Sequence, residues 1–381
     1  MRKALSAVVA FLPFRVAISQ DAPTAPTWEV SGYFVSLLTR STTIVPAGER
    51  YTLDLNRLRL ELAGRPLEDV RIELQYDNEA FLGSYLRTGQ FALTRDRKAV
   101  SFFDLERTYV DRRSVVVRHR MYRATASWSG SDIDVTLGRQ RIAWGTGRFW
   151  SPLDILNPFD ATRIEREERA GVDALLVDRK LGPLGRFNGV LAPATERSRA
   201  AIAGYVHGNA RGTDYSFLVG NFRGERLVGA DFSGRLGGVG IRGEATASRP
   251  DSGRRFVRAL LGADYGFGNT LTVTGELYFN GQGVSEPARY DFPGLLEGRI
   301  RSVARRYGAT AASYQITPLL KLVAYGILNV DDRSRALWPV LEYSAASNLD
   351  LSTGVQMFSG TVGSEYSRFR NVLHFQAKWF F

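Results

Sequence analysis

The chain has 381 residues, of which 44% are hydrophobic and 12% aromatic, a composition unlike that of a disordered protein or a helical membrane protein. Its formal net charge is +11, and the basic side chains are nearly all arginines that alternate with acids along the whole chain. This pattern lacks the basic patch of a nucleic-acid binder, and the absence of cysteine excludes disulfides, thiolate zinc sites and cysteine nucleophiles.

Residues 1–19 have the features of a secretory signal peptide. Arg2 and Lys3 supply a positive start, residues 4–14 are apolar, and residues 17–19 provide a cleavage site. The apolar run is shorter than the roughly 20 residues that a membrane-spanning helix needs, although a short buried helix is an alternative. We therefore expect a signal peptide, a short periplasmic segment over residues 20–26, and a single further domain over residues 27–381.

From residue 27 onward the chain repeats segments of about ten residues in which polar and apolar side chains alternate. Val70, Ile72 and Leu74, for example, alternate with Arg71 and Glu73. Since successive side chains of a strand point to opposite faces, each segment has one apolar and one polar face. The predicted strands are residues 27–40, 50–63, 67–78, 117–129, 131–144, 169–180, 184–192, 199–210, 213–222, 225–235, 237–248, 254–266, 269–281, 303–316, 318–331, 334–346, 348–358 and 367–381.

The connections between these strands alternate in length. The short ones include residues 63–66, 129–131, 182–183, 212–213, 266–269 and 317–318, and the long ones are residues 79–116, 145–169, 193–198, 281–302 and 359–366. A soluble β-sandwich shares the alternating strands but not this arrangement of turns. The sequence therefore predicts an all-β fold, a transmembrane antiparallel up-and-down β-barrel of about 18 strands, or alternatively 16, with short periplasmic turns and long extracellular loops.

Two places interrupt the alternation, residues 54–58 and 137–141. Each puts a polar residue into the apolar row unless one residue is skipped, so both are predicted to be β-bulges.

The segment over residues 138–173 is the richest in unusual residues. Trp144, Phe149 and Trp150 precede a dense cluster of charges in a long loop, and long loops without secondary structure are usually functional. One interpretation is a constriction loop folded into the lumen, where its charges face those of the wall. The other is an extracellular lid held in shape by its own salt bridges. The loop over residues 79–116 is a second candidate plug, with the aromatic and charged run 102–107.

The charged side chains predicted to line the path divide between this loop and the polar rows of the strands. They are Arg139, Arg141, Asp160, Arg163, Glu165, Arg166, Glu167, Glu168 and Arg169 in or near the loop, and Arg71, Glu73, Arg123, Arg242, Glu244, Arg258 and Glu276 on the wall.

Catalytic chemistry has little support in the sequence. The only histidines are His119, His207 and His374, which lie on strands far apart in the predicted order and show no zinc-ligand spacing. No base and nucleophile pair can be assembled around them. We therefore predict no catalytic, metal or cofactor site and no enzymatic activity.

The last strand resembles the C-terminal signature of Gram-negative outer-membrane proteins, in which the final residue is Phe and alternate preceding residues are apolar. Phe375, Trp379 and Phe381 match that row, with Phe380 the one apolar residue on the other row. Gly138-Arg139-Gln140, Trp144-Gly145 and Asn157-Pro158 with Asp160 also look like a segment of several porin-like families. The resemblance implies a location in the bacterial outer membrane and recognition by the outer-membrane assembly machinery.

Together these features predict a porin-like channel for the passive or weakly selective diffusion of small polar, possibly anionic, solutes. The alternatives are a substrate-specific transporter or exporter of polysaccharide or hydrophobic compounds and, less favoured, a barrel enzyme. The expected partners are outer-membrane lipid and lipopolysaccharide, the assembly machinery, small solutes and further copies of the chain, with no nucleic acid and no cofactor.

Overall fold

The computed structural model describes residues 27–45, 47–95, 101–157, 163–165, 169, 171–194, 200–251, 253–296 and 300–381. The predicted signal peptide and periplasmic segment lie outside these residues, so both stay predictions.

The described chain is almost entirely β-structure. Its strands are β1 (Thr27–Thr42), β2 (Arg50–Leu67), β3 (Val70–Leu82), β4 (Glu106–Arg112), β5 (Val115–Ser129), β6 (Ile133–Gln140), β7 (Val172–Lys180), β8 (Arg186–Ala192), β9 (Ala201–Ala210), β10 (Thr213–Phe222), β11 (Glu225–Leu236), β12 (Val239–Pro250), β13 (Phe256–Gly266), β14 (Thr272–Asn280), β15 (Arg306–Thr317), β16 (Leu320–Asn329), β17 (Arg335–Ala346), β18 (Leu349–Ser359) and β19 (Val372–Phe380).

Short helical turns occur only in the long connections of the described chain. They are η1 (Ser84–Arg87), α1 (Gly89–Thr94), η3 (Pro287–Arg289), α2 (Phe292–Leu296) and η4 (Tyr366–Arg368). None of the helices in the described part is long and apolar enough to cross a membrane.

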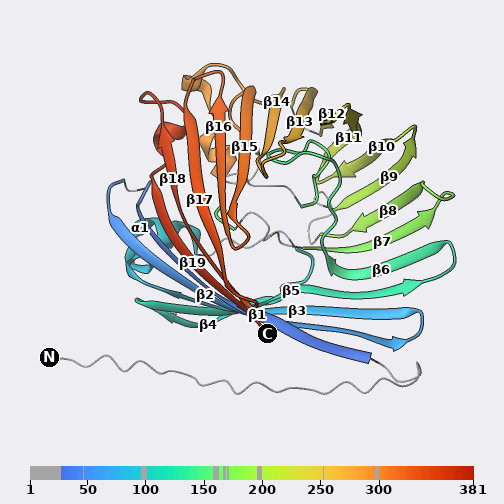
Figure 1. The fold of residues 1–381 in the computed structure, drawn as a ribbon, viewed down its shortest axis with the longest axis horizontal. Coiled ribbons are helices and arrows are strands. Elements are labelled where there is room, and N and C mark those ends of the chain that lie inside the picture. The colour runs from blue at the N-terminus through green and yellow to red at the C-terminus, as the bar shows by residue number, and fades with distance from the viewer. Residues whose placement is uncertain are drawn as a thin grey trace.

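The strands form one closed antiparallel barrel (Figure 1). Of the nineteen described strands, β4 pairs only with β5, over residues 115–120. The other eighteen form a ring in which each strand pairs with its two neighbours. The ring closes where β1, already paired with β2, also pairs with β19. This confirms the predicted barrel of 18 strands. The prediction missed β4, which lies within the segment expected to be an irregular loop.

Alternation along each strand separates an inner from an outer face. On β14, Glu276, Tyr278 and Asn280 are buried, whereas Leu277 is 65% exposed and Phe279 is also exposed. The exposed row is the apolar row expected from the sequence. In a transmembrane barrel this row faces lipid and the opposite row faces the lumen.

The two predicted β-bulges are absent. The pairing of β2 with β1 and β3 runs without a register shift over residues 54–58, and that of β6 with β5 and β7 does so over residues 137–140. The polar residues therefore remain on the outer row and bind partners there. The hydroxyl of Ser36, for example, donates to the Asp54 carboxylate at 3.1 Å.

The last strand closes the barrel through its backbone. The Gly32 N–H donates to the carbonyl of Phe381, and the Phe381 N–H donates to the carbonyl of Gly32, both at 3.0 Å. Phe375, Trp379 and Phe381 are exposed on the outer face, in the row that the sequence predicts. Phe380 packs edge-on against Tyr33.

Gly32, which bonds to β19 at the seam, also shows how closely β1 and β2 must approach. A Cβ atom on Gly32 would lie 2.3 Å from the backbone carbonyl oxygen of Arg59, whereas one on Gly275 would meet no atom within 4 Å. We expect Gly32→Ala to lower the stability of the barrel by about 1–3 kcal/mol, because the clash is with backbone. The matched Gly275→Ala variant should change it little. Urea midpoints and heat-modifiable gel migration measure the difference, and equal effects would contradict this account of the close approach of β1 and β2.

Candidate solute path and constriction loop

Five arginines lie along the inner wall on β2 and β5, and together they are called the arginine wall. They are Arg57, Arg59, Arg118, Arg120 and Arg123. A bulge that the sequence analysis did not predict brings the last of them to this face. Gln75 of β3 pairs with Arg123 and Tyr76 with Met121, so Tyr122 is skipped. The guanidinium of Arg59 lies 3.7 Å and that of Arg123 4.4 Å from the centre of the Tyr122 ring.

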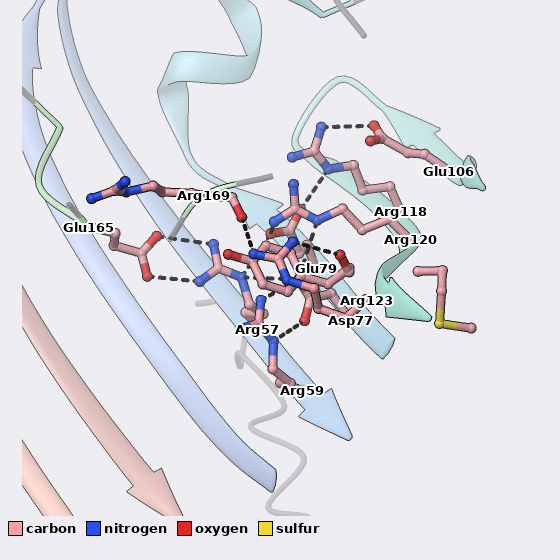
Figure 2. Close-up of polar contacts among 12 residues, drawn as sticks. Arg57, Arg59, Asp77, Glu79, Glu106, Arg118, Arg120, Arg123, Glu165 and Arg169 are labelled. Carbon is pink, nitrogen blue, oxygen red and sulfur yellow. Dashed lines mark hydrogen bonds and ion pairs between the residues drawn. The ribbon is translucent and has the colours of Figure 1, made fainter. Parts of the chain in front are cut away.

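Two acids of β3 lie between these arginines (Figure 2). Asp77 accepts from Arg59 Nε at 2.6 Å and from Arg120 Nε at 3.2 Å. Glu79 accepts from Arg57 Nε at 2.8 Å and from Arg118 Nε at 2.7 Å. The two carboxylates thus bind guanidinium groups of both neighbouring strands, which fixes the long arginine side chains in place.

Access to water differs between the two signs of charge. The Asp77 and Glu79 side chains are 0% and 1% exposed, whereas those of Arg118 and Arg120 are 26% and 22% exposed. These two acids therefore lie beneath the arginines, and the accessible part of this wall consists of Arg118 and Arg120 together with Glu106, which is 25% exposed and accepts from Arg118 Nη1 at 3.1 Å. A solute that passes here meets mainly positive charge.

The chain between β6 and β7, residues 141–171, is called the constriction loop. Its residues 141–157 lie inside the ring of strands (Figure 1), and backbone hydrogen bonds tie them to the inner wall. Glu244 of β12 accepts from the backbone N–H groups of Thr146, Gly147 and Leu153, the last two at 2.5 and 3.2 Å. It also accepts from the Ser151 hydroxyl at 2.8 Å. The Thr146 hydroxyl donates to it as well, at 3.4 Å, so one buried carboxylate holds five donors of the loop.

A second carboxylate continues this attachment two strands away. Glu276 of β14 accepts from the backbone N–H groups of Arg148 at 2.6 Å and Phe149 at 2.9 Å. Arg242 of β12 donates to the same carboxylate at 2.9 Å and also pairs with Asp264 of β13. Glu244, Glu276 and Arg242 lie on the inner rows and are buried. The two carboxylates anchor the loop, and Arg242 pairs with one of them.

Aromatic side chains pack the loop onto the same wall. The Trp144 ring stacks on Tyr205 of β9 with centroids 5.2 Å apart, and Trp150 stacks on Tyr278 of β14 at 5.1 Å. Phe149 and Leu153 are fully buried. The inner rows of β7 to β11 and of β13 to β17 contribute apolar residues to these two clusters, which explains why several of these strands are apolar on both faces.

The end of the loop returns toward the arginine wall. Arg169 donates to the Asp154 carboxylate at 2.8 Å inside the loop, and its carbonyl accepts from Arg123 Nη2 at 2.7 Å. Glu165 binds Arg57 through both carboxylate oxygens, at 2.8 and 3.0 Å (Figure 2). The described part of the loop thus contacts opposite walls of the lumen, β12 and β14 on one side and β2 and β5 on the other.

The second candidate plug takes a different course. Arg139 of β6 forms an ion pair with Asp173 of β7 at 2.8 Å, and these two side chains bind the carbonyl and the N–H of Phe103 at 2.7 and 2.9 Å. Because β6 has no bulge, Arg139 lies in the same row as the exposed Leu137, on the outer face. Residues 101–105 therefore cover the wall at the long-loop end of β6 and β7.

The remaining predicted lining residues lie apart from the arginine wall. Arg71 and Glu73 form an exposed pair on β3, and Arg258 of β13 binds Glu225 at 3.0 Å. Arg141 and Arg163 are exposed on the constriction loop. Asp160, Arg166, Glu167 and Glu168 lie outside the described residues.

Sequence reasoning missed most of the arginine wall and both of its acids. Arg57 and Arg59, Asp77 and Glu79, and Arg118 and Arg120 are three pairs of like charges two residues apart. Two residues of a strand at that spacing share a face, so each pair marks an inner row. The repeat of this spacing on β2, β3 and β5 was the signal that could have identified the wall.

The histidines do not assemble. His119, His207 and His374 lie on β5, β9 and β19. In the described part of the chain no group of three or more His, Cys, Asp or Glu side chains could hold a metal ion.

Glu365, called here the loop clamp, joins the 360–371 connection to β15 and β16 and, through Asn329, to Tyr290 of the connection before β15. The carboxylate of Glu365 accepts from the Tyr307 hydroxyl at 2.9 Å and from the side-chain amide of Asn329 at 2.8 Å. That amide also donates to the Tyr290 hydroxyl at 3.1 Å. Burial raises the pKa of Glu365 to about 7, and the two hydrogen bonds only partly offset this effect.

Comparisons with known proteins give a likeness in fold. No protein-family model and no curated protein matches the chain. Among solved structures, Acinetobacter baumannii OccAB1 is similar with a TM-score of 0.58 at 9% identity, covering 93% of this chain and 96% of that one. Pseudomonas aeruginosa OccK5 (OpdH) has a TM-score of 0.56 at 11% identity, with coverages of 94% and 97%. The P. aeruginosa outer membrane protein opdK has a TM-score of 0.56 at 11% identity, with coverages of 93% and 98%. The chain therefore has the barrel fold of these outer-membrane proteins.

Removing both anchor carboxylates should release the constriction loop. In a Glu244→Ala/Glu276→Ala variant, seven donors of the loop lose their acceptors, and bonds to a charged group contribute about 1.5–3 kcal/mol each. We expect faster proteolysis within residues 141–171 and a larger single-channel conductance. Glu342→Ala is the control, because Glu342 pairs with Lys321 away from the loop. An unchanged loop in the double variant would show that aromatic packing alone holds it.

The loop clamp should weaken as the pH rises. The pKa of Glu365 is raised from 4.5 to about 7, so the closed clamp binds a proton more tightly than the open one. Its stability therefore falls between these two pH values, by an amount on the order of 3 kcal/mol or less. Hydrogen exchange of residues 360–371, corrected for intrinsic rates, should be slower at pH 5 than at pH 8. Glu365→Gln should remove this difference and Glu286→Gln, at an exposed site, should not; a difference that survives Glu365→Gln would refute the assignment.

Proposed function

We propose that the protein is an outer-membrane channel for the diffusion of small polar solutes, with a preference for anions. The observation that carries the anion preference is the inner wall, where accessible arginines lie above fully buried acids. The anchor carboxylates Glu244 and Glu276 are likewise covered by the loop. Charge that a solute can reach is therefore more positive than the count of wall residues implies.

The outer face supports a position in the membrane. Leucine, isoleucine, valine and phenylalanine side chains are exposed on the outer rows all round the ring. Exposed aromatics gather at the short-turn end, among them Trp28, Trp128, Phe267 and Trp379. Such a girdle is typical of the interface between lipid and water. The short turns would then lie in the periplasm and the long loops outside the cell.

The partners follow from this placement. Small solutes pass the constriction loop, and lipid surrounds the outer rows. We include recognition of Phe375, Trp379 and Phe381 by the assembly machinery, contact with lipopolysaccharide, and association with further copies of the chain in the proposal. These rest on the C-terminal pattern and on the fold of the related structures.

Ion selectivity in planar bilayers tests the function. With purified, refolded protein in a salt gradient, we expect reversal potentials that indicate a preference for anions. Arg118→Gln/Arg120→Gln should reduce the permeability ratio of anions to cations by roughly a factor of two or more, because it removes the accessible charge. Arg226→Gln, at an exposed pair with Asp251, is the control. Clear cation selectivity of the native protein would rule out the preference.

Removing residues 146–168 from the constriction loop gives an independent measure of the channel. The conductance should rise severalfold, because an 18-stranded barrel is wide enough for an aqueous channel when no loop fills it. Conductance close to zero in both proteins would contradict diffusion and favour a gated transporter.

A further inference from the structure

A notch opens at the long-loop end of the barrel, directly above β19. Leu373 of β19 pairs with Arg40 of β1, and Val372 pairs with Gln356 of β18. Both neighbours extend further, β1 to Thr42 and β18 to Ser359, whereas β19 stops. The space above its end has a volume of about 1060 Å³, and its sides are formed by Ile44, Val45 and Arg50 between β1 and β2 and by the 360–371 connection.

Four arginines line this notch and no acidic residue does. They are Arg40, Arg50, Arg368 and Arg370. Within the described residues, none of them has a carboxylate at ion-pair distance, in contrast to most arginines of the inner wall. Arg370 donates only to backbone carbonyls, and Arg368 lies over the ring of Phe292 at 4.0 Å. The notch is therefore an uncompensated positive site.

Apolar side chains accompany this charge. Ile44, Val45 and Val362 line the notch and are exposed at the tips of its two connections. Below it, Leu38, Leu373 and Phe375 are exposed on the outer row, and Leu38 pairs with Phe375 in the register of the seam. Positive groups thus stand directly above an apolar strip that faces outward. A ligand that fits both must carry phosphate or another strong anion on top of hydrocarbon chains.

We propose that this notch binds a phosphorylated glycolipid of the outer leaflet, with its phosphates on the arginines and its acyl chains along Leu38, Leu373 and Phe375. Guanidinium groups bind phosphate with two parallel hydrogen bonds, and each one near a charged lipid surface adds to the attraction. The inference rests on the proposed location in the outer membrane, because only that leaflet presents such a lipid at the long-loop end. It does not depend on the channel being open or selective.

The probe is diphosphoryl lipid A added to the delipidated full chain in detergent, with bound lipid counted by native mass spectrometry. The native protein should retain it, and Arg40→Ala/Arg50→Ala should reduce the retained fraction on the order of tenfold. Arg254→Ala/Arg255→Ala is the matched control, since it removes two exposed charges just before β13, several strands away from the notch around the ring. Arg40→Lys/Arg50→Lys should restore part of the binding, and heat-modifiable migration should show all variants to be folded.

Two further lipids and one ion separate the sources of phosphate. Monophosphoryl lipid A should bind more weakly than the diphosphoryl form, and phosphatidylglycerol weaker still. Equal retention of phosphatidylglycerol, full competition by millimolar inorganic phosphate, or an equal loss in the control variant would overturn the proposal. Single-channel conductance should be the same in all variants. If the native protein shows no conductance, the proposed channel function is contradicted, whereas the result of the lipid-binding measurement still stands.

Discussion

A peptide segment that crosses a lumen without forming a helix or strand leaves its backbone N–H groups in need of acceptors. Here two wall carboxylates, Glu244 and Glu276, provide them over residues 146–153. Each carboxylate in turn becomes tolerable in a buried position because several donors surround it. The position of the constriction loop, the burial of its aromatic residues and the width left for a solute all depend on this exchange of hydrogen bonds.

The hydrogen bonding of the wall carboxylates also determines which charges a solute meets along its path. Acids that would repel an anion are occupied, either by loop donors on one wall or by guanidinium groups on the other. Arginine side chains are longer than those of aspartate and glutamate, so their ends remain nearer the solvent after pairing. A wall can therefore be close to neutral in composition and still present a positive surface. The net charge of the sequence does not distinguish this arrangement from a wall on which acidic and basic side chains are equally exposed.

Alternation of polar and apolar residues made the ring of strands predictable, because the signal repeats within each strand and needs no knowledge of its neighbours. β4 was missed since its sequence, Glu106–Arg112, mixes charges with apolar residues and pairs with one strand only. The importance of the constriction loop followed from its aromatics and length. Its anchors did not, because Glu244 and Gly147 are 97 positions apart and nothing local in the sequence relates them. Both predicted bulges are absent, so a polar residue in the apolar row of a sequence does not by itself indicate a bulge. It can equally indicate a polar side chain that has a hydrogen-bond partner on the outer face.

The seam between β1 and β19 also fixes the order of events during folding. The hydroxyl of Ser41 donates to the carbonyl of Asn371 at 2.7 Å across 330 positions of sequence, so this contact has no counterpart in a partly formed barrel. Until it forms, both strands keep an open edge that can pair with another chain. The notch above β19 comes into existence at the same moment, because its two sides belong to the two ends of the sheet. A ligand of the notch would therefore bind only barrels whose seam has closed, and would not bind barrels that are still open.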